Sequence, residues 1–344
     1  MGTFSTLIGQ YLEPARVLPP DATSLRKIAG SLRSSFTAGD TAALPSAVGF
    51  EIERELVFMP KEQFSSLYDQ IRPAYLSFGA CGEATLHGHL AEMVAHATAG
   101  GTRVQVVTHG ALLTPERASR LLNADLGKLK VSIDGAEPAV YAKYRPGGDL
   151  EVVLRNVERL VAMRDARRLS VPVVELQMVL FREDLDQAEK LVDLCRTRFP
   201  GVTPNFLMGR AGLVARAIQP GDSEAVRILG RARDLAAAFG FRRAATSLSH
   251  GIVEVTTDLS SAPCFVPWYS CMISTDGAVY PCCYHTVRGV SVGNACTSPF
   301  AAVWNGPRMA EFRRALRTRR CDDAVCAACT YDDRGMDRVF GLFR

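Results

Sequence analysis

The apolar residues from position 61 onwards follow two alternating spacings, which predicts a regular succession of helices and strands. Phe64, Leu67 and Ile71 recur at the spacing of a helical face, and the run 74–79 that follows is typical of a short buried strand. Thr114 followed by Pro115 indicates the start of a helix. The pattern predicts helices over 61–72, 88–101, 114–127, 149–166, 184–198 and 222–239, and strands over 74–79, 103–110, 128–135, 171–180 and 202–209.

Helices of this length between strands indicate a parallel sheet whose connections are right-handed crossovers. The strands are almost continuously apolar, which favours a sheet that is covered on both faces. An open doubly wound sheet and a barrel, complete or partial, both satisfy this pattern. We therefore expect an α/β fold, and the spacing alone does not choose between these architectures.

The regular alternation of predicted helices and strands ends near residue 255. The stretch 263–294 combines short apolar runs, turn residues and cysteines, and a predicted helix over 307–318 precedes a cysteine-rich tail. With 344 residues the chain is long enough for one large domain and a smaller one. We expect an N-terminal extension over 1–30, a large domain over 31–250 and a small domain over 251–344.

The cysteines are concentrated in the small domain, where eight of the ten lie between Cys264 and Cys329. In a reducing compartment such a cluster indicates a metal site more often than disulfides. Cys326 and Cys329 form a Cys-x-x-Cys pair, and Cys264 and Cys282 supply a second pair of thiols. Four thiolates fit zinc or a 4Fe-4S cluster. Buried free thiols are the simpler interpretation for Cys81, Cys195 and Cys296.

The residues around this cluster resemble the SPASM domain of radical S-adenosylmethionine proteins. The resemblance rests on Cys264, Pro267-Trp268, Gly277 five residues before Cys282, Gly293-Asn294, Trp304-Asn305, Arg313 and the closing Cys326-Ala-Ala-Cys329. It implies that Cys264, Cys282, Cys326 and Cys329 hold one auxiliary 4Fe-4S cluster. Alternatives for the first or third of these ligands lie close by in the sequence, at Cys271, Cys283 and Cys321.

The large domain resembles the radical S-adenosylmethionine fold, a partial (β/α)6 barrel. Residues 77–90 are similar to the family's Gly-Gly-Glu segment, with Cys81 in place of the first glycine and Gly82-Glu83 retained. The resemblance implies that Gly82 and Glu83 hold the methionine amino group of S-adenosylmethionine, through a charge-assisted contact.

Two further strand ends carry the resemblance. Ser132 and Asp134 follow a strand at the end where ribose contacts are expected in barrels of this kind. His109 replaces the asparagine of a Thr-Asn-Gly strand end, and a titrating group there is a candidate general base. No catalytic residue is identified by the sequence, and the candidates are Cys81 and His109.

The three cysteines that hold the first cluster in this family are missing. Aligning residues 57–64 with the helix after the family's cluster loop puts the Cys-x3-Cys-x2-Cys positions on Asp40, Leu44 and Ala47. Only one of these side chains has a donor atom, so the trio cannot hold a cluster. We therefore do not expect the 5'-deoxyadenosyl radical to form by the usual route.

Composition and charge exclude few functions. A net charge of +4, 22 % charged residues and 47 % hydrophobic residues are ordinary for a globular protein, and we expect no nucleic-acid partner. No apolar run reaches the roughly 18 residues of a membrane span, so we expect no membrane segment. The first twenty residues lack the pattern of a secretion signal, which makes the cytoplasm the expected location.

Three functions stay open from the sequence. Gly82-Glu83 and Asp134 favour a divergent enzyme that tailors a peptide, an amino acid or a sugar and binds S-adenosylmethionine without forming a radical. The lost cysteines favour a non-catalytic partner, which binds a substrate or an intact homologue while its cluster gives structure or relays electrons from a donor. The third hypothesis is a zinc-binding module without redox chemistry.

Overall fold

The computed structural model describes residues 5–8, 58–79, 82–208, 218–256, 264–288, 291–317 and 326. Five positions of interest lie outside these residues, namely Asp40, Leu44, Ala47, Cys81 and Cys329. Their expected roles therefore stay predictions.

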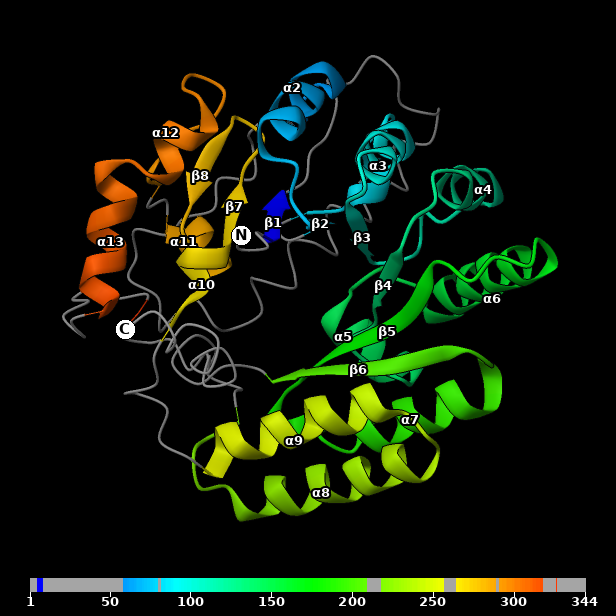
Figure 1. Cartoon of the computed structure of the whole chain (residues 1–344). Helices are drawn as coiled ribbons and strands as arrows, with labels where there is room; N and C mark the ends of the chain where they lie inside the picture. The colour runs from blue at the N-terminus through cyan, green and yellow to red at the C-terminus, as the bar shows by residue number, and fades with distance from the viewer. Residues whose placement is uncertain are drawn as a thin grey trace.

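One sheet of nine strands runs through the described chain, in the order β6-β5-β4-β3-β2-β1-β7-β8-β9 (Figure 1). Strands β1 to β6 are parallel, and each lies beside its neighbour in the sequence. Among the described strands β6 pairs only with β5, so the parallel strands do not close on themselves within the described residues. The bounds are β1 Ser5–Ile8, β2 Tyr75–Phe78, β3 Arg103–Thr108, β4 Lys128–Ser132, β5 Val173–Leu180, β6 Val202–Met208, β7 Ser270–Ile273, β8 Ala278–Tyr280 and β9 Gly293–Asn294.

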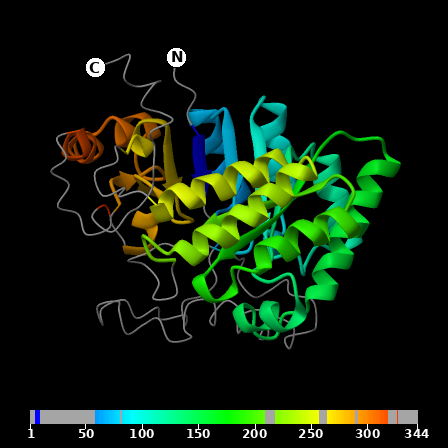
Figure 2. The same ribbon diagram turned by 90° about the horizontal axis from the view of Figure 1, so that it is seen from below.

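Helices connect the parallel strands and cover one face of the sheet (Figures 1 and 2). Side chains cap the N-terminal ends of several of these helices. Thr114 accepts a hydrogen bond from Arg117 N, and Asp149 accepts one from Glu151 N. In the large domain the helices are α2 Lys61–Ile71, η2 Ala84–Leu86, α3 Leu90–Ala99, α4 Pro115–Asn123, α5 Pro138–Tyr144, α6 Leu150–Ala166, η3 Arg182–Asp184, α7 Gln187–Arg198, α8 Ser223–Ala238 and α9 Arg242–Thr256.

The helices and strands predicted between residues 61 and 239 are all present, with ends that differ by a few residues. The pattern missed α5 and α9. Helix α5 is short and buries one large side chain, Tyr141. Helix α9 does place Ala244, Leu248 and Val255 on one buried face, but the small residues between them weaken the apolar signal.

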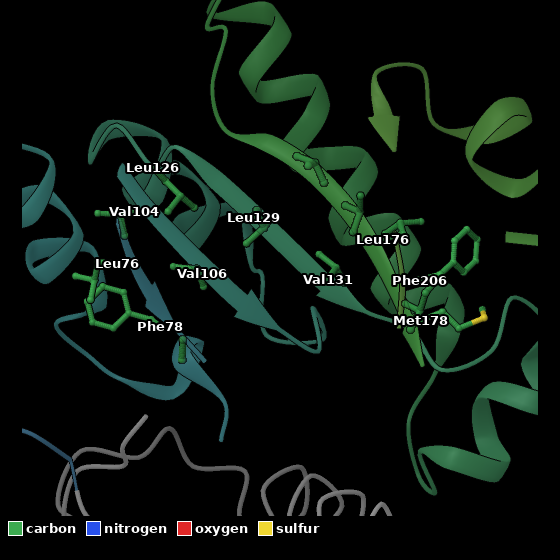
Figure 3. Close-up of a cluster of buried hydrophobic side chains, with 14 of the residues drawn as sticks. Leu76, Phe78, Val104, Val106, Leu126, Leu129, Val131, Leu176, Met178 and Phe206 are labelled. Carbon is green, nitrogen blue, oxygen red and sulfur yellow. The ribbon is translucent and has the colours of Figure 1, made fainter. Parts of the chain in front are cut away.

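The two faces of the sheet differ in chemistry. Alternate strand residues pack with the helices in one hydrophobic core, and they include Leu76, Phe78, Val104, Val106, Leu129, Val131, Leu176 and Met178 (Figure 3). Since successive side chains of a strand point to opposite faces, the residues between them line the other face, which we call the inner face. Polar residues on that face are Ser77, Gln105, Lys128, Lys130, Ser132, Glu175, Gln177, Thr203 and Asn205, and apolar Val107, Val179 and Leu207 lie between or beyond them. The polar positions of these strands therefore gather on the inner face.

The C-terminal part adds strands β7 to β9 and the helices α10 Val266–Tyr269, α11 Cys283–Arg288, α12 Phe300–Trp304 and α13 Pro307–Arg317. Arg313 joins this part together, because it donates hydrogen bonds of 2.9 Å to Pro267 O and to Trp304 O. Its guanidinium also lies 4.3 Å from the centre of the Trp304 ring.

The two parts of the chain are in contact. Strand β1 pairs with β2 on one side and with β7 on the other, both in parallel. Helix α12 packs against α2, and Phe300 N donates a 3.1 Å hydrogen bond to Gln70 Oε1. Helix α9 continues past residue 250 to Thr256, across the expected domain boundary. No helix in the described ranges has the length and apolar character of a membrane span.

Candidate functional site

The predicted site residues of the large domain gather where the parallel strands end. Glu83 follows β2, His109 follows β3, and Ser132 and Asp134 lie at the end of β4. Because parallel strands present their carboxyl ends at one edge of the sheet, these residues share what would be the mouth of the barrel.

Glu83 is the centre of a buried hydrogen-bond network. Its Oε1 accepts hydrogen bonds from Thr85 N at 3.0 Å and from Thr108 Oγ1 at 2.5 Å, and a third from the hydroxyl of Thr85. Its Oε2 accepts from His109 N at 2.7 Å. The carboxylate is 2 % exposed, so these four donors replace the water that it would otherwise bind.

The ring of His109 closes the remaining side of Glu83. Its Nε2 lies 3.4 Å from Glu83 Oε2, and its Nδ1 accepts a 3.0 Å hydrogen bond from Ala111 N. An accepting Nδ1 carries no proton, and Nε2 makes no hydrogen bond with any described residue. The side chain is 10 % exposed, and the general base expected at this position is therefore held against a carboxylate rather than open to solvent.

The amino group of S-adenosylmethionine would need a free oxygen of Glu83. In this arrangement Oε1 already accepts three hydrogen bonds, and Oε2 faces the backbone and the ring of His109. Gly82 is exposed, and the role that the sequence implied for Gly82 and Glu83 stays a prediction.

Asp134 is paired with Arg145. Arg145 Nε and one terminal nitrogen lie 2.8 and 2.6 Å from Asp134 Oδ2, and the two side chains are 16 % and 14 % exposed. Burial alone would lower the pKa of Arg145, but the charge and hydrogen bonds of Asp134 outweigh it and keep the pKa above its ordinary value. A side chain at Gly135 would collide with the backbone of Tyr141, so glycine lets α5 pack close to the strand end.

The pairing partner Arg145 was missed from the sequence, although it lies eleven positions after Asp134 in a glycine-rich loop. Ser132 is half-buried on the inner face, beside Gln177 in the register. The strand ends at the mouth thus carry polar side chains, of which Glu83 and Asp134 are each bound by other residues of the chain.

Three of the four predicted cluster ligands are described, and all three are half-buried: Cys264, Cys282 and Cys326. Among the described residues no three His, Cys, Asp or Glu side chains surround one point, and Cys329 lies outside them. The thiol set suits a thiolate-bound metal by its chemistry, and its assembly stays a prediction.

The structure adds a neighbour that the sequence reasoning did not name. His285 Nδ1 lies 3.1 Å from Cys282 Sγ. The His285 side chain is fully buried. Its ring makes a T-shaped contact with the ring of Phe312, and the two ring centres are 4.9 Å apart. The spacing of three residues between Cys282 and His285, across the start of a helix, is the signal that could have found it.

Both parts of the chain match known protein families. Residues 52–195 match the radical SAM superfamily, and residues 264–330 match SPASM, an iron-sulfur cluster-binding domain. Together these segments cover more than half of the chain. The chain belongs to the radical SAM superfamily and carries a SPASM domain, and members of this family use iron-sulfur clusters and S-adenosylmethionine.

Named relatives are tailoring or biosynthetic enzymes. The chain is 28 % identical to an AdoMet-dependent heme synthase of Nitratidesulfovibrio vulgaris, over 73 % of this chain and 70 % of that enzyme. It is 26 % identical to a PqqA peptide cyclase of Streptomyces rochei, over 75 % and 70 % of the two chains.

Solved structures support the fold. Streptococcus suis SuiB bound to S-adenosylmethionine superposes with a TM-score of 0.60 at 11 % identity, over 96 % of this chain and 73 % of that one. The anSMEcpe structure with bound AdoMet gives 0.55 at 15 % identity, over 94 % and 84 %. At such identities the likeness shows the fold alone, and it confirms the predicted fold class.

Proposed function

We propose that this protein is a divergent radical SAM and SPASM tailoring protein, which binds a peptide or small-molecule substrate at the barrel mouth and lacks the radical-generating cluster. The observation that carries the proposal is the mouth itself. The network around Glu83 and the Asp134–Arg145 pair keep polar groups ordered at three strand ends, which a purely structural barrel does not need.

We infer the loss of the first cluster from the side chains at its three ligand positions. Asp40, Leu44 and Ala47 occupy the motif positions, and they offer at most one ligand among three. One auxiliary 4Fe-4S cluster on Cys264, Cys282, Cys326 and Cys329 is the remaining iron site in this proposal. Thiols of this kind persist in a reducing compartment, so we place the protein in the cytoplasm.

A non-catalytic partner of an intact homologue is the second candidate. The hydrogen bonds to Glu83 support it, because donors of the protein already occupy Oε1 and bind one side of Oε2. In this case the barrel binds the substrate or the homologue, and the cluster serves structure or electron transfer.

The test is made on full-length protein purified without oxygen. Iron and acid-labile sulfide are measured first, and about four irons per chain are expected from one cluster. Calorimetric titration with S-adenosylmethionine then separates the two candidates, because only the tailoring enzyme is expected to bind it. About eight irons, or release of 5'-deoxyadenosine under a strong reductant, would overturn the proposal, whereas zinc without sulfide would establish the binding module.

A further inference from the structure

A buried histidine lies beside one of the predicted cluster ligands. Cys282 comes directly before α11, and His285 is the third residue of that helix. This spacing brings the two side chains together at the start of the helix, where His285 Nδ1 lies 3.1 Å from Cys282 Sγ. Groups that contact a ligand atom influence the metal that the ligand holds, so the contact bears on the chemistry of the cysteine site.

Packing limits how the ring of His285 can turn. The side chain is fully buried, and its ring stands at 89° to the ring of Phe312 on α13. Helix α13 is itself tied down, because Arg313 donates hydrogen bonds to Pro267 O and to Trp304 O. A ring that is packed in this way keeps its rotamer, so Nδ1 stays directed at Cys282.

The state of the sulfur decides which atom donates. A cysteine that holds a metal is a thiolate, which has no proton and can only accept a hydrogen bond. A ring nitrogen of histidine donates when it carries a proton. When Cys282 ligates a metal, a hydrogen bond between these two atoms therefore requires the proton on His285 Nδ1.

A donor at a ligand sulfur changes the reduction potential of a cluster. Hydrogen bonds to the sulfurs are among the factors that set this potential. The reduced cluster carries one more electron, which makes its ligand sulfurs more negative, so a donor stabilises the reduced form more than the oxidised form. Because His285 is buried, water does not compete for its N–H.

We propose that His285 donates an Nδ1–H···Sγ hydrogen bond to the Cys282 thiolate and thereby raises the reduction potential of the auxiliary cluster. The inference rests on the proposed function in taking Cys282 as a ligand of an iron-sulfur cluster. His285 acts through Cys282, so it is a positioning residue that makes the cluster easier to reduce.

The first experiment compares the reduction potentials of full-length proteins purified without oxygen and matched for iron and sulfide. His285→Phe removes the donor but keeps a ring to pack against Phe312, whereas His285→Asn keeps an amide N–H near the place of Nδ1. Redox titration followed by electron paramagnetic resonance gives the ratio of reduced to oxidised cluster at a fixed potential.

This ratio is expected to fall about tenfold in His285→Phe, which is about 59 mV for a one-electron couple. In His285→Asn it is expected to stay within about twofold of the wild type, because a donor to the sulfur is retained. His250→Phe, at an exposed histidine of α9, is the control and is expected to change nothing.

A second measurement gives an answer even if His285→Phe does not take up iron. Wild-type protein that contains 15N-labelled histidine is reduced, and the coupling of the label to the cluster is measured by pulsed electron paramagnetic resonance. A weak coupling is expected from a hydrogen bond through sulfur, and it is expected to disappear in His285→Asn, which lacks the labelled ring.

An unchanged potential in iron-loaded His285→Phe would overturn the inference. Absence of histidine coupling, or the strong coupling of a nitrogen bound directly to iron, would also overturn it. Each of these results leaves the auxiliary cluster and the proposed function standing. Zinc without sulfide would instead refute the proposed function and the inference together, and metal analysis identifies that case before any potential is measured.

Discussion

Glu83 and His109 meet through two contacts at the mouth of the barrel. The backbone N–H of His109 donates to Glu83 Oε2 at 2.7 Å, and ring Nε2 lies 3.4 Å from the same oxygen. The two residues that the sequence predicts for the site thus lie against each other at the strand ends. Two backbone N–H groups and two threonine hydroxyls of this chain donate hydrogen bonds to Glu83.

Glu83→Gln tests how much this network stabilises the fold. The substitution replaces a charged acceptor with an amide, so donors from Thr85, Thr108 and His109 lose charge-assisted hydrogen bonds. We expect the free energy of unfolding to fall by about 2 to 4 kcal/mol in urea denaturation. Glu62→Gln, at a side chain that is 80 % exposed, is the control. A similar small loss for both variants would contradict the buried network.

Breaking the Asp134–Arg145 pair from one side leaves the other charge buried. We expect Arg145→Met to lower the free energy of unfolding by about 3 kcal/mol, because the Asp134 carboxylate loses its cation. The double variant Asp134→Asn/Arg145→Met is expected to lose less than the sum of the single variants, and urea denaturation of all four proteins measures the coupling. Additive losses would mean that the pair is not coupled.

The raised pKa of Tyr75 predicts that the free energy of unfolding falls at alkaline pH. Burial first, and Glu175 second, raise the pKa of Tyr75 from 10.0 to about 12, while Arg243 acts in the opposite direction. The folded protein therefore keeps a proton that the unfolded chain loses. The contribution is complete below about pH 10 and disappears as the pH rises to about 12.

Denaturation of the wild type and of Tyr75→Phe at a series of pH values measures this effect. Lys130 and other groups titrate in both proteins, so the difference between the two curves isolates the phenol. The stability of the wild type relative to Tyr75→Phe is expected to decline across this window. Parallel curves would show that Tyr75 titrates normally.

The cysteine tail makes a prediction about metal content. Changing Cys326 and Cys329 to Ala together is expected to remove the iron and sulfide of the auxiliary cluster, about four irons per chain. Cys195→Ala is the matched control, because that thiol is buried in α7 and burial raises its pKa well above its ordinary value. Iron that survives the double change, or that disappears with Cys195, would contradict the assignment.

The sequence predicted the parallel α/β core because long helices and apolar strands repeat at clear spacings. It missed α9, where small residues mark the buried face, and α5, which buries little. Arg145 and His285 could not be placed, since their contacts depend on how a loop and a short helix turn towards a neighbour. The ion pair of Lys130 with Glu175 was hidden for a related reason, because alternation shows which residues share a face but not which of them make contact.

Strand β1 has a consequence for how the protein assembles. Ile8 pairs with Ile273, so the seventh strand reaches its place beside the first only after most of the chain has been synthesised. Closing so long a loop is slow, and until then the edge of β1 that pairs with β7 is open to wrong partners. The nascent chain should thus be most prone to aggregation just before the cysteine-rich part emerges from the ribosome, and metal loading should follow that late step.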